Sequence, residues 1–372
     1  MRIVHCFRAP VGGVFRHVRD LCEAQIAEGH DLGIVCDSNT GGPHEDRLIA
    51  EIAPKLALGL IRTPMQRHIG PGDITASRRT LKALKRMRPD ILHGHGAKGG
   101  FYSRTFGTLM RAGGQSVARL YSPHGGSLHY DPKSAAGRVY FGIERMLERL
   151  TDHLVFVSDY ERRTYEDKVG VPRCPSTVVY NGLREEEFEP VEPADGASDF
   201  LFVGTMRDLK GPDLFLLALK SVEDKTGRAL TATLVGDGAD LPRYRQLAES
   251  LEFGERVQFL PAMSAREAFR LGRLMVVPSR AESMPYIVLE ALAAGKSLIA
   301  TKVGGIPEIF GPSSPALCMP SADSLVAAME QALADESAWR KLMPGREALV
   351  ARFSLGAMAR NISRIYQECL SP

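Results

Sequence analysis

Several common signals are missing from this 372-residue sequence. No apolar run reaches membrane-spanning length. The amino end, residues 1–7, is too short and too polar for a secretory signal and is typical of a first strand, so we expect a cytoplasmic protein. The six cysteines form no C-x-x-C pair, and several lie in apolar contexts, which favours reduced thiols over disulfides. No zinc-ligand spacing or RNA-binding signature is visible, so we expect neither a metal centre nor nucleic-acid binding.

The composition is that of an ordinary globular protein, with 44% hydrophobic and 24% charged residues. The length suggests at least two domains. The net charge of +3 conceals an asymmetry, because residues 1–184 hold 27 Lys and Arg against 18 Asp and Glu, whereas residues 185–372 hold 20 against 26. A basic N-terminal half indicates an anionic partner, such as a phospholipid or a pyrophosphate-linked lipid.

The segment most indicative of a ligand-binding site is residues 279–290, with the sequence SRAESMPYIVLE. The apolar run 274–278 predicts a buried strand before it, and residues 286–294 predict a helix that Pro285 starts and Gly295 ends. The start of such a helix attracts an anion. Glu282 and Glu290 flank it, and a carboxylate can accept two hydrogen bonds from a vicinal diol. A ligand that carries an anion next to vicinal diols fits this pattern, and a nucleotide sugar is such a ligand.

This pair of glutamates, separated by seven residues and with Ser-Met-Pro after the first, resembles the E-x7-E motif of the retaining glycosyltransferases of family 4, of the bacterial surface-polysaccharide type. The resemblance covers nearly the whole chain. It implies an α/β protein with the GT-B fold, in which two Rossmann-like, doubly wound domains face each other across a cleft. The acidic, Pro-rich segment 185–198 predicts the linker. We therefore expect an acceptor-binding domain over 1–187, joined by a crossover helix over 355–372, and a donor-binding domain over 198–354.

In the second domain the resemblance assigns the donor site. Lys210 matches the family's diphosphate-binding lysine, but the family's preceding arginine position holds Thr205, so Arg207 is the candidate for that charge. Glu282 would orient the sugar and Glu290 would bind the ribose. The remaining donor contacts would come from the base-binding segment and from the residues that follow Glu282: Phe259, Leu260, Ser283, Met284 and Pro285. We expect no metal cofactor, because cations and the helix start would stabilise the charge that develops on the leaving diphosphate.

In the first domain the resemblance assigns two histidines and a loop that would contact the donor diphosphate or the acceptor. Gly12 and Gly13 follow the first strand, and this loop lacks the G-x-G-x-x-G dinucleotide pattern. His95 ends a strand and would line the cleft. A metal site at His93 and His95 is disfavoured, because no third ligand is placed nearby. His124 also follows a strand and would face the transferred sugar or the acceptor. The predicted catalytic set is Glu282, His124, Lys210 and Arg207.

A predicted helix over 73–88 carries six basic residues: Arg78, Arg79, Lys82, Lys85, Arg86 and Arg88. A solvated basic face explains them without further function. The alternative is docking on an anionic membrane surface, where each basic residue adds about 1 kcal/mol. Peripheral attachment to the inner face of the cell membrane therefore remains an open alternative.

The resemblance implies a retaining glycosyltransferase of the hexosyltransferase type. It would transfer a sugar from a nucleotide-sugar donor to a hydroxyl of a glycan or lipid-linked acceptor, in exopolysaccharide or lipopolysaccharide biosynthesis. Two alternatives stay open. A nucleotide-sugar epimerase would form product without an acceptor, and a non-catalytic nucleotide-sugar-binding protein would bind the donor without turnover.

Overall fold

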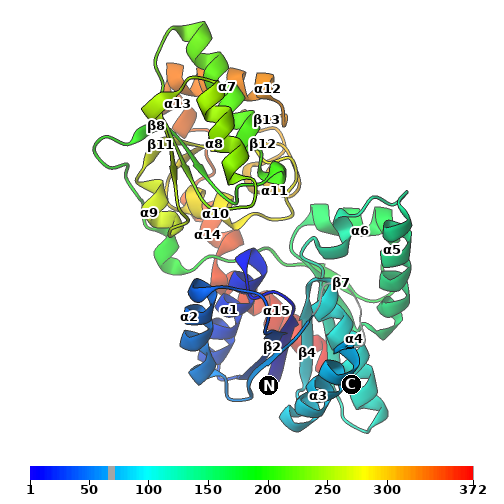
Figure 1. The fold of residues 1–372 in the computed structure, drawn as a ribbon. Helices are drawn as coiled ribbons and strands as arrows, with labels where there is room; N and C mark the ends of the chain where they lie inside the picture. Colours follow the sequence, from blue (N-terminus) through cyan, green and yellow to red (C-terminus); the bar gives the residue numbers. More distant parts are fainter. Residues whose placement is uncertain (66–71, 372) are drawn as a thin grey trace. The chain divides into compact units, whose positions relative to one another are not determined.

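The chain divides into two compact units, each with its own parallel sheet (Figure 1). The computed structural model describes the backbone of residues 1–65 and 72–371. Unit 1 comprises Met1–Gly182 and Leu355–Pro372, and unit 2 comprises Leu183–Ser354. Among the described residues, no helix combines the length and the apolarity that a membrane span requires.

The sheet of unit 1 has seven strands in the order β3-β2-β1-β4-β5-β6-β7, and every pairing is parallel. The strands are β1 (Arg2–Phe7), β2 (Asp31–Asp37), β3 (Gly59–Thr63), β4 (Ile91–His95), β5 (Ala118–Ser122), β6 (His153–Phe156) and β7 (Ser176–Val178). The helices are α1 (Gly12–Ala27), α2 (Pro43–Ile52), α3 (Gly72–Met87), α4 (Gly96–Ala112), α5 (Ala135–Leu147), α6 (Asp159–Lys168) and α15 (Leu355–Leu370).

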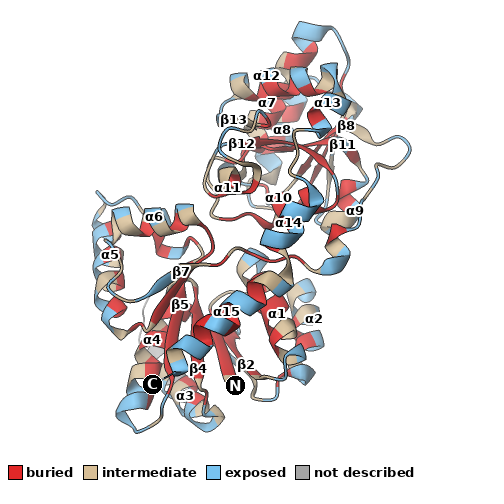
Figure 2. Cartoon of the chain, turned by 180° about the vertical axis from the view of Figure 1, so that it is seen from behind, coloured by how far each residue is buried: buried red, intermediate tan, exposed pale blue. Residues whose placement is uncertain are grey.

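The central strands of unit 1 are buried on both faces, as expected for a parallel sheet between two helical layers (Figure 2). One face packs on α1, α2 and α15, through residues such as Val18, Ile49 and Ile362. The other packs on α3 and α4, through residues such as Leu84 and Phe106. The last helix of the chain, α15, thus completes the core of the first unit, as the sequence predicts.

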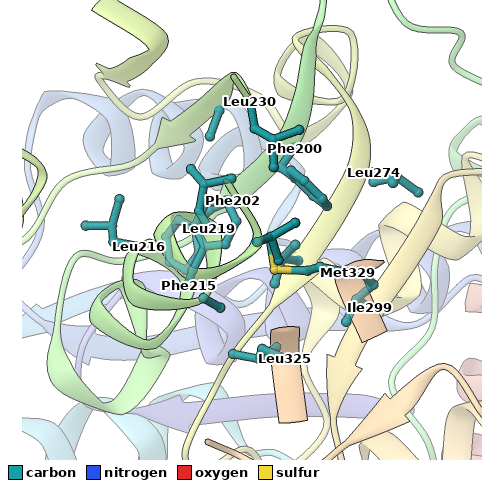
Figure 3. Close-up of a cluster of buried hydrophobic side chains, with 14 of the residues drawn as sticks. Phe200, Phe202, Phe215, Leu216, Leu219, Leu230, Leu274, Ile299, Leu325 and Met329 are labelled. Atoms are coloured by element: carbon teal, nitrogen blue, oxygen red, sulfur yellow. The ribbon is translucent and has the colours of Figure 1, made fainter. Parts of the chain in front are cut away.

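The sheet of unit 2 has six parallel strands in the order β10-β9-β8-β11-β12-β13. They are β8 (Ser198–Val203), β9 (Ala232–Val235), β10 (Val257–Leu260), β11 (Gly272–Val277), β12 (Ser297–Thr301) and β13 (Leu317–Cys318). The helices are α7 (Pro212–Thr226), α8 (Leu241–Ser250), α9 (Ala265–Phe269), α10 (Tyr286–Ala293), α11 (Ile306–Phe310), α12 (Ala322–Ala334), α13 (Glu336–Arg340) and α14 (Arg346–Phe353). Figure 3 shows the main apolar cluster, in which Phe200, Phe215 and Met329 pack between the sheet and helices α7 and α12.

The boundary between the units lies at Gly182–Leu183, earlier than the predicted 187. The acidic segment predicted as a linker belongs to unit 2 because its backbone is bonded there. The N–H of Val191 donates to the carbonyl of Ala294 (2.9 Å), and that of Ala194 donates to the carbonyl of Arg270 (2.8 Å). Composition alone did not reveal these long-range bonds.

Candidate active site

The donor residues predicted in unit 2 gather where the order of its sheet reverses. β8 and β11 are neighbours in the sheet, but the chain continues from β8 to β9 on one side and from β11 to β12 on the other. In open α/β sheets, ligands bind beyond the carboxyl ends of the strands at such a switch point. Lys210 follows β8, and Glu282 follows β11. The topology therefore brings together two residues that are 72 positions apart in the sequence.

Lys210 and Glu282 form an ion pair, with 2.6 Å between Lys210 Nζ and Glu282 Oε1. The same carboxylate oxygen accepts a hydrogen bond from the hydroxyl of Ser279 (2.7 Å). Thr301, at the end of β12, in turn donates to the carbonyl of Ser279 (2.6 Å). The side chains of Lys210 and Glu282 are only 21% and 9% exposed, so both charges are held in one place at the rim of the sheet.

Arg280 connects the two loops that carry this pair, and the sequence analysis gave it no role. Its guanidinium makes two hydrogen bonds to the carboxylate of Asp213, at 2.9 and 2.6 Å, and a third to the carbonyl of Asp208 (2.6 Å). Burial alone raises the pKa of Asp213, but the bonds from Arg280 outweigh this effect and lower it. The loop after β11 is thereby tied to the start of α7, which fixes Lys210 beside Glu282.

Two glycines allow the backbone to close around this pair. Gly304 has φ +59°, and a Cβ there would lie 1.7 Å from the carbonyl oxygen of Glu282. Gly211 has φ +69°, and a Cβ there would lie 2.2 Å from the carbonyl oxygen of Pro278. Both positions therefore exclude larger residues, because side chains avoid this φ and the space is filled. The N–H of Gly305 donates to the carbonyl of Ser283 (2.8 Å), so this turn supports the loop after Glu282.

Helix α10 begins directly after this loop. Pro285 is its N-cap residue, with ψ 121°, and not the first helical residue as predicted. Within the described part of the chain no side chain caps this start, and its first turn contains no acidic residue. Met284 and Pro285 are buried, and Ser283 is half-buried. Glu290 lies just over a turn into the helix and is half-buried. An uncapped helix start of this kind suits an anion.

The remaining donor candidates are less closely joined to this pair. Arg207 is exposed, and no side-chain partner for it is present among the described residues; Thr205 beside it is exposed as well. Phe259 packs partly against the core of unit 2. The carbonyl of Leu260 accepts from the N–H of Gly236 (3.0 Å). Because β10 is an edge strand, part of its backbone faces away from β9, as contact with a base would require.

Unit 1 has its own switch point, between β1 and β4. Gly12 and Gly13 follow β1, are exposed and begin α1. Residues 94–99, at the end of β4 and the start of α4, read GHGAKG, a G-x-G-x-x-G pattern that was not predicted to have a role. Two of its glycines are needed for close packing, since a Cβ on Gly99 would lie 2.1 Å from the carbonyl oxygen of Cys6 and one on Gly94 would lie 2.4 Å from that of Gly99. A Cβ on Gly96 would meet no atom within 4 Å, but its φ of +67° favours glycine.

Five histidines gather at this switch point, although only two of them were predicted as site residues. His5 lies on β1, His17 on α1, His93 and His95 on β4, and His124 follows β5. Ring nitrogens of His5, His93 and His95 lie within 4.8 Å of one another, as do those of His17, His95 and His124. The expectation that His93 and His95 lack a third ligand nearby is therefore wrong, because parallel pairing aligns β1 with β4.

Burial keeps these imidazoles neutral. It lowers the pKa of His5 and of His17 to about 4, and it lowers the pKa values of His93, His95 and His124 well below the ordinary value. Neutral imidazoles can bind a metal, so each triad could hold one. Both triads include His95.

The loop that carries His124 is held by a buried carboxylate. Glu161 accepts hydrogen bonds from the N–H groups of Gly125 and Val157. Burial raises the pKa of Glu161 to about 7, against these two bonds. His124 itself has φ +50°, a conformation that non-glycine residues seldom adopt. The carboxylate therefore stabilises a strained turn at the end of β5.

The chain resembles known proteins over most of its length. Residues 11–187 match the family model described as Glycosyltransferase Family 4, and residues 184–346 match that described as Glycosyl transferases group 1. An uncharacterised 41.2 kDa protein in the cps region of Klebsiella pneumoniae is 27% identical over 329 residues, which cover 83% of each chain.

Two solved structures share the fold over almost their whole length. Sucrose-phosphate synthase from Thermosynechococcus elongatus has a TM-score of 0.78 at 21% identity, covering 99% of each chain. Anabaena HepE in complex with UDP and glucose has a TM-score of 0.81 at 15% identity, also covering 99% of each chain.

Two doubly wound parallel units of this kind have the GT-B fold. Within that class, the chain belongs to glycosyltransferase family 4, as the motif around Glu282 and Glu290 predicts.

Proposed function

We propose that this protein transfers a sugar from a nucleotide-sugar donor to a hydroxyl of a glycan or lipid-linked acceptor, with retention of the anomeric configuration. The observation that carries the proposal is the Lys210–Glu282 pair at the switch point of unit 2, beside the start of α10. A cation beside a helix start suits a diphosphate, and a carboxylate suits sugar hydroxyls.

In this mechanism Lys210, Arg207 and the start of α10 bind the diphosphate. Glu290 binds the ribose hydroxyls, and Glu282 orients the sugar. The acceptor hydroxyl attacks from the face that the diphosphate leaves, so the configuration at the anomeric carbon is kept. Positive charge develops on the sugar and negative charge on the diphosphate, and the fixed cations stabilise the latter.

The acceptor side is assigned to unit 1, where His95 and His124 lie at the end of the sheet. A growing surface polysaccharide is the acceptor that we favour. Its support is the Klebsiella relative from a cps region and the basic N-terminal half of the chain. An acceptor of this kind is carried on a lipid, which also gives the exposed basic residues of α3 a role.

A panel of nucleotide sugars in a thermal-shift assay tests the donor proposal. A ligand that binds only the folded protein raises the melting temperature by mass action. We expect one nucleotide sugar, and its nucleoside diphosphate, to give a clear shift. The shift should persist in EDTA, because protein cations and the helix start bind the diphosphate without a metal. The nucleotide sugar that raises the melting temperature should then be consumed only when an acceptor is present.

Each alternative function makes a different prediction in this assay. An epimerase would convert the donor without an acceptor. A non-catalytic binding protein would show the shift and no turnover with any acceptor glycan. No shift with any nucleotide sugar would contradict the proposal itself.

We also propose that α3 docks on an anionic membrane surface. All six basic residues named above are exposed, whereas Thr80 and Leu84, on the opposite side of the helix, are buried. At about 1 kcal/mol for each basic residue near the surface, the set can hold the protein on a charged bilayer. The attraction should weaken with salt.

Co-sedimentation with vesicles tests this docking. We expect binding to vesicles that contain anionic lipid, little binding to neutral vesicles, and loss of binding when the six residues are changed to glutamine. A matched control changes six exposed basic residues of unit 2 to glutamine: Lys225, Arg228, Arg243, Arg245, Lys341 and Arg346. Equal loss in both variants would show that net charge, and not α3, determines binding.

A further inference from the structure

A chain of hydrogen bonds runs through the interior of unit 1 and ends at His124. Gln25 Oε1 lies 2.9 Å from His5 Nε2. His5 Nδ1 lies 2.9 Å from His95 Nε2, and His95 Nδ1 lies 2.9 Å from His124 Nε2. Gln25, His5 and His95 are 0%, 0% and 1% exposed, so water does not compete for these bonds.

Neutral rings leave few ways to place the protons in this chain. Each imidazole carries one N–H, which donates, and one bare nitrogen, which accepts. Each of the three contacts needs one donor and one acceptor. The polarity of the first contact therefore determines the second, and the second determines the third, so only two arrangements exist, running in opposite directions.

Gln25 determines which of the two arrangements is present. Its carbonyl oxygen faces His5, so His5 Nε2 carries the proton and His5 Nδ1 accepts. His95 must then donate from Nε2 and accept at Nδ1, and His124 must donate from Nε2. This leaves Nδ1 of His124 as a bare, accepting nitrogen.

Tyr366 of α15 lies close enough to Gln25 to interact with it. Burial raises the pKa of the Tyr366 hydroxyl, and the interaction with Gln25 acts in the opposite direction. The hydroxyl lies 2.7 Å from His93 Nδ1. The orientation of the amide is given by its oxygen, which lies on His5, while its nitrogen has no hydrogen-bond partner among the described residues.

We propose that Gln25, His5 and His95 are positioning residues that hold His124 in the tautomer with Nδ1 unprotonated. This nitrogen then accepts a hydrogen bond from a hydroxyl of the sugar or of the acceptor. The proposal rests on the proposed function for the identity of that hydroxyl, but not for the tautomer. It also means that a group able only to accept hydrogen bonds is rejected at this position.

The distances favour this hydrogen-bond relay, the chain from Gln25 to His124, over a metal ion in the same place. Nitrogen ligands lie about 2.0–2.1 Å from zinc in a tetrahedral site, which separates them from one another by roughly 3.3–3.4 Å. The separation of 2.9 Å between His95 and His124 is that of an N–H···N hydrogen bond. A metal at His17, His95 and His124 would have to break the contact that ends the relay.

Nitrogen NMR of protein labelled at histidine with ¹⁵N reads the tautomers directly and needs no substrate. At pH 7.5 we expect His124 to show a bare Nδ1 and a protonated Nε2, with its signals assigned by their loss in His124→Gln. Gln25→Met should release the chain and give His124 a mixture of both tautomers, whereas Gln25→Glu, which still accepts from His5, should keep the single form. Gln115→Met is the matched control, because Gln115 lies outside the relay.

Three results would overturn the proposal. They are a proton on Nδ1 of His124 in the unaltered protein, an unchanged tautomer in Gln25→Met, and stoichiometric zinc in the purified protein that disappears in His95→Gln. The tautomer of the unaltered protein is informative even if a variant does not fold. Failure of the proposed function would leave these signals unchanged, so the two failures can be told apart.

With the donor identified by the panel, kinetics supply the second measurement. Gln25→Met should lower kcat/KM in proportion to the fraction of His124 that leaves the tautomer with a bare Nδ1, which is about twofold for an even mixture. Gln25→Glu should recover most of this loss, and Gln115→Met should show none. Equal activity in Gln25→Met and the unaltered protein would show that the tautomer does not serve turnover.

Discussion

Replacing Lys210 by methionine should lower sugar transfer at least 100-fold and weaken binding of the nucleoside diphosphate. Methionine keeps most of the length of the side chain but removes the charge that faces the leaving diphosphate. Removing one preorganised group that stabilises developing charge costs 10²–10³ in kcat in well-studied enzymes. The measurement is initial-rate transfer from the donor found by the panel, together with the thermal shift given by its diphosphate.

Glu282→Gln should separate binding from turnover. Glutamine can still accept the hydrogen bond from Ser279, but it removes the negative charge beside Lys210. Transfer should fall by about 100-fold, because the carboxylate no longer orients the sugar hydroxyls. The diphosphate should bind as tightly as before or more tightly, because Lys210 is no longer neutralised in the unliganded protein.

Matched controls for this pair lie elsewhere on unit 2. Lys220→Met removes an exposed lysine that pairs with Asp224, and Glu336→Gln removes a glutamate that pairs with Arg273. Surface pairs of this kind contribute little, so both controls should retain normal transfer and normal melting temperatures. Near-normal transfer by both Lys210→Met and Glu282→Gln would remove these two residues from the active site.

Acid should unfold unit 1 at a pH where unit 2 remains folded. A histidine whose pKa is lower in the folded than in the unfolded protein contributes its full stability above the unfolded value of 6.5. That stability is lost as the pH falls towards the folded value, which is about 4 for His5 and His17. At pH 5 the loss is on the order of 2 kcal/mol for each of these two residues.

Glu161 opposes this trend by a smaller amount. Its pKa is raised to about 7 in the folded protein, so the folded state binds its proton first and gains stability as the pH falls from 7 towards 4.5. One carboxyl group acts against five histidines whose pKa values are all lowered. The net effect on unit 1 is a loss of stability in acid.

Hydrogen exchange at pH 7.5 and pH 5 measures this loss for each unit separately. Amides of β1 and β4 should lose protection at pH 5, whereas those of β8 and β11 should keep it. His17→Gln should reduce the difference, because one buried imidazole is removed. His44→Gln, on α2, is the control and should leave it unchanged. Equal loss of protection in both units would contradict the prediction.

Much of the fold could be predicted from local patterns. The strand Arg2–Phe7 and the last helix, Leu355–Leu370, lie within the predicted segments 1–7 and 355–372, because a continuous apolar run and a regular apolar face are local properties. The loop and helix after Glu282 were found in the same way. Pro285 differs by one position, since a proline near a helix start fits the N-cap as well as the first turn.

The sites were predicted only in part. Lys210 and Glu282 were each assigned to the donor site through a family resemblance, but neither their ion pair nor the Arg280–Asp213 clamp that holds it has a local signature. His5 and His17 each stand without another histidine nearby in the sequence, and a single histidine predicts nothing. Parallel pairing of β1 with β4 is what places His5 beside His93 and His95.

The sequence alone determined the class of this protein: two α/β units, a basic N-terminal half, and two glutamates at the start of a helix. These are properties of composition and of short spacing. The tertiary structure decided where the first unit ends, what holds Lys210 beside Glu282, and how Gln25 comes to control the tautomer of His124. Each of these depends on contacts between residues far apart in the chain, and only the folded sheets bring such residues within hydrogen-bonding distance.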